Sequence, residues 1–82
     1  MNEVFLIGKV VTEIHFNFLI ELKYISVASF YIETINKQII SIKAYDELAD
    51  FTYRNLATGN LVFVYGKLEH DYVKANRLEI MK

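Results

Sequence analysis

The fold class predicted for this 82-residue chain is all-β with one helix, folded as a single domain over residues 1–82. Two runs, Ile39–Tyr45 and Leu61–Leu68, are short and rich in β-branched or aromatic residues, which is typical of strands. A third run, Ile14–Leu22, alternates strictly between apolar and other residues, as half-buried strands do. Between the first two runs, a narrow stripe at helical spacing predicts the helix, at Leu48, Phe51, Thr52 and Leu56.

The first predicted strand covers Val4–Val11, and both of its faces are apolar. We therefore expect protein to cover both faces. A bend near Thr12 and Glu13 leads into Ile14–Leu22, which we expect to continue the first strand. A reversal is expected within Glu21–Tyr24, although no glycine, proline or Asn-Gly pair marks it.

The second predicted strand is Val27–Thr34 and the third is Ile39–Tyr45, joined by a turn at residues 36–38. Because successive side chains in a strand point to opposite sides, the pattern assigns two faces. The predicted inward residues are Ala28, Phe30, Ile32, Ile40, Ile42 and Ala44. The predicted outward residues are Ser29, Tyr31, Glu33, Ile39, Ser41, Lys43 and Tyr45.

The helix is expected to begin at Asp46, whose side-chain oxygen is a suitable N-cap. Glu47 and Asp50 place further negative charge on its first turns, where the helix dipole favours it. Gly59 follows where the helix should stop, since glycine enters the left-handed region without steric cost. The apolar stripe accounts for the whole pattern, so the helix is interpreted as a structural lid on the sheet.

The fourth predicted strand, Leu61–Leu68, contains Gly66, and the last predicted strand is Tyr72–Met81. A glycine inside a strand marks a bulge, a barrel bend or a close backbone contact. The fourth strand also has an apolar outer side, as does the first. The two outer stripes consist of Leu61, Phe63 and Tyr65, and of Phe5 and Ile7.

Composition limits the classes of function. The chain is 54% hydrophobic with six Tyr and six Phe, more apolar material than one small core needs. This favours a subunit interface over the alternative, a core unusually rich in aromatic rings. The net charge of −1 gives no general attraction to nucleic acid, so binding would require a local patch. No run is long enough to cross a membrane and no signal-peptide pattern is present, so a cytoplasmic location is expected.

Residues for catalysis or metal binding do not come together in the sequence. The chain has no cysteine, and His15 and His70 are isolated from paired carboxylates, so no metal site is expected. The acidic residues near the helix start are explained by the helix dipole. No nucleophile-and-base set and no phosphate-binding glycine loop is found. We therefore predict no enzyme activity, no cofactor and no small-molecule substrate.

Five short segments, in order, resemble the bacterial single-stranded DNA-binding proteins (SSB). They are Asn2–Val10, Val27–Phe30, Ala44–Ala49, Gly59–Val62 and Tyr65–Leu68, and they extend over nearly the whole chain. The resemblance implies an OB-fold, a five-stranded barrel with the helix between strands three and four. It also implies sequence-independent binding of single-stranded DNA, in replication, recombination or repair, by a homodimer or homotetramer.

The sequence departs from this family in its loops and at its end. The connections at residues 36–38 and 69–71 are shorter than is usual, and residues 21–24 lack the usual glycine and proline. Because the chain ends at Lys82, no disordered tail for recruiting partners is expected. Short loops and the absent tail are similar to the primosomal OB proteins, which bind single strands as tailless dimers.

OB-folds stack bases on aromatic rings over strands two and three, while basic groups follow the phosphates. Tyr45 matches a stacking position of the family, and Tyr31 lies on the same predicted face, with Lys43 between them. The alternative is that the two tyrosines only cover the sheet. Two further stacking positions of the family fall near Ile39 and Gln38, which are not aromatic, and a third falls loosely near Tyr72. The predicted nucleic-acid site is Tyr31, Ser41, Lys43, Tyr45, Lys37, Lys9, Lys67, Tyr72, Lys74 and Arg77.

In the family, strands one and four make subunit contacts, so the predicted oligomer interface is Phe5, Ile7, Leu61, Phe63 and Tyr65. The alternative is that the helix or Ile14–Leu22 covers these residues. A second function also stays open, an OB-fold assembly or protein-interaction subunit with little or no DNA binding. The near-neutral charge and the loss of stacking residues favour that second function, as does an acidic residue, Glu33, on the DNA face.

Overall fold

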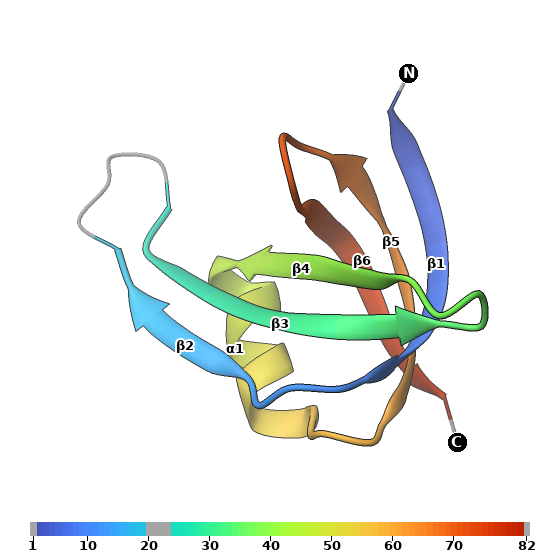
Figure 1. Ribbon diagram of the computed structural model, residues 1–82. Helices are drawn as coiled ribbons and strands as arrows, with labels where there is room; N and C mark the ends of the chain where they lie inside the picture. The colour runs from blue at the N-terminus through green and yellow to red at the C-terminus, as the bar shows by residue number, and fades with distance from the viewer. Residues whose placement is uncertain (1, 20–23, 82) are drawn as a thin grey trace.

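The computed structural model describes residues 2–19 and 24–81 (Figure 1). In these ranges, strands curve into a barrel and one helix packs mainly against β3 and β4. The elements are β1 (Glu3–Val10), β2 (His15–Phe18), β3 (Ser26–Thr34), β4 (Ile39–Tyr45), α1 (Asp46–Asn55), β5 (Leu61–Leu68) and β6 (Val73–Met81). Apart from β2, the predicted strand bounds agree with these to within one residue at each end.

Strand pairing closes the barrel. The order is β1-β5-β6-β4-β3-β2, and an additional pairing between β1 and β3 completes the ring. All these pairs are antiparallel except β4 with β6. β1 pairs with β3 through Gly8–Val10 and β2 pairs with β3 further along, so both are parts of one interrupted first strand. The predicted five-stranded OB barrel, with its helix between the third and fourth strands, is confirmed.

The core lies inside the barrel, where the period-two pattern predicted it. Phe30 and Ile32 of β3, Ile42 of β4 and Val62 and Val64 of β5 are fully buried and pack together. The remaining inward residues predicted on β3 and β4 are Ala28 and Ala44, which are also buried, and Ile40, which is half-buried. The outward set predicted on these strands lies outside the core.

The helix start differs from the prediction. Asp46 is the first helical residue, Tyr45 occupies the N-cap position, and no side chain caps the helix. The Asp46 carboxylate instead accepts hydrogen bonds from the backbone amides of Ile25 and Ser26. The predicted Asp46 cap is therefore wrong, because a distant segment occupies its acceptor oxygen.

The helix also stops earlier than Gly59. It ends at Asn55, and the extended residue Leu56 donates its amide to the Thr52 carbonyl at 2.9 Å. Gly59 does adopt the left-handed conformation, with φ 97°, but in the following turn. There its amide donates to the carbonyl of Val10, so Gly59 joins the helix–strand connection to β1.

The predicted strand Ile14–Leu22 is shorter in the structure. β2 has four residues, and Phe18, expected to face inward, is 77% exposed. It lies at the edge of the sheet, where its ring contacts Phe16 edge-on. Residues 20–23 lie outside the described ranges, and with them most of the predicted reversal at Glu21–Tyr24.

Leu56 provides a test of the helix segment as a structural lid. Its side chain is 5% exposed and belongs to the core cluster, so Leu56→Ala should lower the free energy of unfolding by about 2–3 kcal/mol. Urea denaturation measures this change. A variant as stable as the wild type would contradict the packing role. A variant that loses DNA affinity at unchanged stability would give this segment another role.

Candidate nucleic-acid interface

The strand registers align polar residues in one row across the outside of the barrel. His15 of β2 pairs with Ser29, Ser29 with Lys43, Lys43 with Lys74, and Lys74 with Lys67. Their chain neighbours on β3, β4 and β6 point inward and are buried, so this row faces outward. We call these five residues the basic row. Its three lysines form a cationic path across β4, β6 and β5.

Three tyrosines gather beside this row. The rings of Tyr24 and Tyr45 stack with centroids 4.3 Å apart, and Tyr45 interacts with Tyr72 through its side-chain hydrogen bond. Lys43 Nζ lies 4.7 Å from the centre of the Tyr72 ring. Lys74 Nζ donates to the Tyr24 hydroxyl and lies 5.8 Å from the centre of the Tyr45 ring. We call these three rings and two ammonium groups the tyrosine–lysine cluster.

The local environment shifts the pKa values of two groups in this cluster further above neutral pH. Burial, followed by the hydrogen bond with Tyr72, raises the pKa of Tyr45 to about 12, so its hydroxyl stays neutral at physiological pH. The hydrogen bond with Tyr24 raises the pKa of Lys74, which stays protonated. Glu69 acts electrostatically on both groups and is an acidic neighbour of the cluster. The arrangement offers neutral aromatic surface between positive charges.

A hollow of about 570 Å³ opens next to the cluster. Tyr24, Tyr45 and Lys74 form one side, and the first turn of α1, at residues 46–48, forms another. The start of the helix therefore borders the candidate site, although the sequence pattern indicated only a structural lid.

The structure distributes the other predicted site residues over a wider area. Tyr31 and Ser41 are cross-strand partners on the same face, two residues along from Ser29 and Lys43. Lys9 lies one row further, opposite Glu33, and Lys37 lies in the β3–β4 turn. The fold thus unites Lys43, Tyr45, Lys67, Tyr72 and Lys74, and leaves Lys9, Lys37 and Arg77 apart from the cluster.

Two residues of this region were missed by sequence reasoning. Tyr24 falls in the predicted reversal, where no periodic pattern assigns a face. His15 was considered only as a metal ligand. The alternation of Ile14–Leu22 already placed it on the outer side, so the register with Ser29 was a usable signal.

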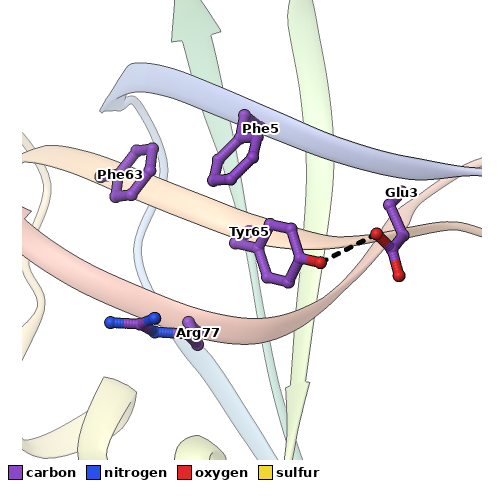
Figure 2. A pocket seen from close by; sticks show the side chains of 5 residues that line it. All are labelled: Glu3, Phe5, Phe63, Tyr65 and Arg77. Carbon is purple, nitrogen blue, oxygen red and sulfur yellow. Dashed lines mark hydrogen bonds between the residues drawn. The ribbon is translucent and has the colours of Figure 1, made fainter.

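Arg77 lies instead beside the aromatic residues of β1 and β5 (Figure 2). The Phe5 ring stacks on Phe63 at 5.4 Å and contacts Tyr65 at 4.7 Å, centroid to centroid. The Tyr65 hydroxyl donates to the Glu3 carboxylate at 2.9 Å. A hollow of about 500 Å³ is lined by Glu3, Phe5, Phe63, Tyr65 and Arg77. We call Phe5, Ile7, Leu61, Phe63 and Tyr65 the aromatic stripe.

Within the described residues, neither α1 nor β2 covers the aromatic stripe. α1 packs against β2, β3, β4 and β6, while β2 pairs with β3. Phe5 is 66% exposed, and Ile7 and Leu61 are exposed as well. In the described residues these elements therefore leave the stripe uncovered, and within those residues the expected covering of both faces of the first strand is not met.

Other kinds of site were also sought in the described part of the chain. There, no three His, Cys, Asp or Glu residues come close enough together to bind a metal ion. In residues 2–19 and 24–81, no helix has the length and hydropathy needed to cross a membrane.

Solved structures provide the comparison with known proteins. No protein-family model and no curated protein matches the sequence. The single-stranded DNA binding protein from Thermus aquaticus aligns with a TM-score of 0.88 and 23% identity, over 100% of this chain and 41% of that chain. The small single-stranded DNA-binding protein from Streptomyces coelicolor aligns with a TM-score of 0.85 and 18% identity, over 96% of this chain and 91% of that one. The SSB domain of a Synechococcus protein aligns with a TM-score of 0.85 and 14% identity, over 96% of this chain and 94% of that one.

These similarities agree with the resemblance seen in the sequence. This chain spans less than half the length of the Thermus aquaticus protein and nearly the full length of the other two chains. At these identities the comparison establishes the fold. The chain has an OB-fold like that of these SSB structures.

Proposed function

We propose that this protein binds single-stranded DNA without sequence preference, through the tyrosine–lysine cluster and the basic row. The observation that carries this proposal is the grouping of three tyrosine rings with two lysine ammonium groups on the outer face of β4 and β6. Bases stack on such rings whatever their identity, and lysines contact the phosphates. Replication, recombination or repair are the processes that need such binding.

The charge distribution favours modest affinity. The chain carries a net charge of −1, so attraction depends on the local row rather than on the whole molecule. With about two to four phosphates neutralised, the logarithm of affinity should fall with the logarithm of salt concentration with a slope of about −1.5 to −3. Titration of labelled oligo(dT) at several salt concentrations measures this slope.

Tyr45→Ala should weaken oligo(dT) binding by about tenfold or more, because it removes a stacking ring. The salt slope should change little, since no cation is lost. Lys43→Ala should instead reduce the magnitude of that slope by about one unit at most. A matched control is Tyr53→Ala, which removes an exposed tyrosine of α1 that packs on Phe16 rather than in the cluster.

The alternative function makes a different prediction for the same experiment. An OB-fold assembly subunit with little DNA binding is favoured by the near-neutral charge and by Glu33 and Glu69 near the site. If the wild type fails to bind oligo(dT), or Tyr45→Ala stays folded and binds equally well, this alternative gains and the stacking role fails.

We also infer that the protein forms a homodimer or homotetramer through the aromatic stripe. The stripe is mostly apolar and continuous across β1 and β5, with Phe5, Ile7 and Leu61 exposed and Phe63 and Tyr65 half-buried. Exposed apolar patches of this kind on small proteins are typical of subunit contacts. The stripe holds few polar groups for any other surface role.

A further inference from the structure

Asp46 links the strand that carries Tyr45 to the segment that carries Tyr24. Its Oδ1 accepts hydrogen bonds from the amide of Ile25 at 2.7 Å and from the amide of Ser26 at 3.3 Å. The same carboxylate makes no capping bond to the helix that it begins. Since Tyr45 precedes Asp46 and Tyr24 precedes Ile25, this contact lies directly beside the stacked ring pair.

Besides its stacking on Tyr45 and the Lys74 contact to its hydroxyl, Tyr24 is positioned through the backbone of the residue that follows it. The Ile25 side chain is 71% exposed and does not anchor the segment in the core. Its backbone is held instead, because the carbonyl accepts from the Leu19 amide at 2.7 Å and the amide donates to Asp46. Hydrogen bonds to an ionised acceptor are stronger than neutral ones, so Asp46 is well suited to this task.

The backbone of Asp46 shows that the carboxylate has a specific use. Its φ of 56° lies in the left-handed region, which glycine adopts without steric cost. Aspartate also places a negative charge at the hollow that Lys74 lines. Glycine would suit the backbone better, and Glu47 already places negative charge in the first helical turn, so the distinct contribution of aspartate at this position is its acceptor oxygen.

We infer that Asp46 is a positioning residue that holds Tyr24 over Tyr45 and so assembles the stacking surface for a single strand. The inference rests on the proposed function and deepens it. Asp46 itself does not contact DNA. It acts by connecting the loop before β3 to the start of α1.

Two substitutions separate the acceptor from the charge. Asp46→Gly removes both and suits the left-handed backbone, while Asp46→Asn removes only the charge and keeps an acceptor oxygen. Asp46→Gly should weaken oligo(dT) binding by about fivefold, as expected for part of one stacking contact. Asp46→Asn should bind at least as tightly as the wild type. Since losing a negative charge favours DNA binding, weaker binding of the glycine variant cannot come from electrostatics.

Glu47→Gln is the matched control, because Glu47 is the neighbouring exposed acid in the same helical turn. It removes one charge and leaves the hydrogen bonds of Asp46 intact, so its affinity should equal or exceed that of the wild type. Equal affinities for Asp46→Gly and Glu47→Gln would overturn the inference.

A measurement without DNA distinguishes this inference from the proposed function. Nuclear Overhauser contacts between the Tyr24 and Tyr45 rings should be present in the wild type and in Asp46→Asn, and lost in Asp46→Gly. If they persist in Asp46→Gly, Asp46 does not position Tyr24 and the inference is wrong. If they are lost while oligo(dT) affinity is unchanged, Tyr24 adds nothing to the stacking surface and the inference fails, whereas the proposed function is decided separately by the Tyr45→Ala titration.

Discussion

Gly66→Ala is expected to lower the free energy of unfolding by about 4 kcal/mol or more, at the upper end for a single substitution. A Cβ at this position would lie 2.1 Å from the carbonyl oxygen of Lys74 and 3.0 Å from the Cα of Ala75. These are backbone atoms of β6, so no side-chain rotation relieves the contact. Because domains of this size have only about 5–10 kcal/mol of total stability, the melting temperature should fall by well over 10 °C.

The strand register explains why β6 cannot simply move away. Gly66 pairs with Ala75 while the preceding Tyr65 pairs with Arg77, which leaves Asn76 as the extra residue of a bulge. Three residues before this bulge, β6 begins to pair with β4, and that pairing helps to close the barrel. Moving β6 away from Gly66 would therefore strain the β4–β6 contact and displace Lys74, which belongs to the candidate site.

Gly59→Ala is the matched control, because it adds the same atom where nothing lies within 4 Å. Its left-handed backbone still makes alanine unfavourable, by about 1–2 kcal/mol. Thermal and urea denaturation of both variants separate steric overlap from backbone strain. Similar melting temperatures for the two would contradict the close contact at Gly66.

The sequence predicted the faces of the strands well, since period-two alternation is a local property. It also identified Gly66 as a bulge, a bend or a close contact. The structure shows both a bulge and a close backbone contact at this residue. The bulge decides where Arg77 lies. Without the extra residue Asn76, alternation from the buried Ala75 would point Arg77 into the barrel, whereas the bulge places it outside, opposite Tyr65.

Contacts between distant segments could not be predicted from local patterns. Asp46 has the usual properties of a helix N-cap, yet its carboxylate accepts hydrogen bonds from backbone amides about twenty residues earlier in the chain. In the candidate site, Lys43 and Tyr45 follow from the alternation of one strand. Lys74 and Tyr72 join them only through the parallel β4–β6 register, which no local pattern specifies. Tyr24 lies in a connection without any periodicity.

Phe5→Glu is expected to raise the dissociation constant of the proposed oligomer by about 100-fold or more. Phe5 belongs to the aromatic stripe, where its ring contacts both Phe63 and Tyr65. A carboxylate there would lie against the apolar stripe of the partner and beside Glu3, which lines the same hollow and carries the same charge. In a symmetric dimer the substitution acts twice.

The fold of the single chain should tolerate this change, because Phe5 is 66% exposed and no core packing is lost. Ile35→Glu is the matched control, since Ile35 is 92% exposed in the β3–β4 turn, outside the stripe, and the change in charge is the same. Sedimentation velocity over the micromolar range should show wild type and Ile35→Glu associated and Phe5→Glu as a monomer. A monomeric wild type would contradict the proposed oligomer, and equal association of both variants would place the subunit contacts outside the stripe.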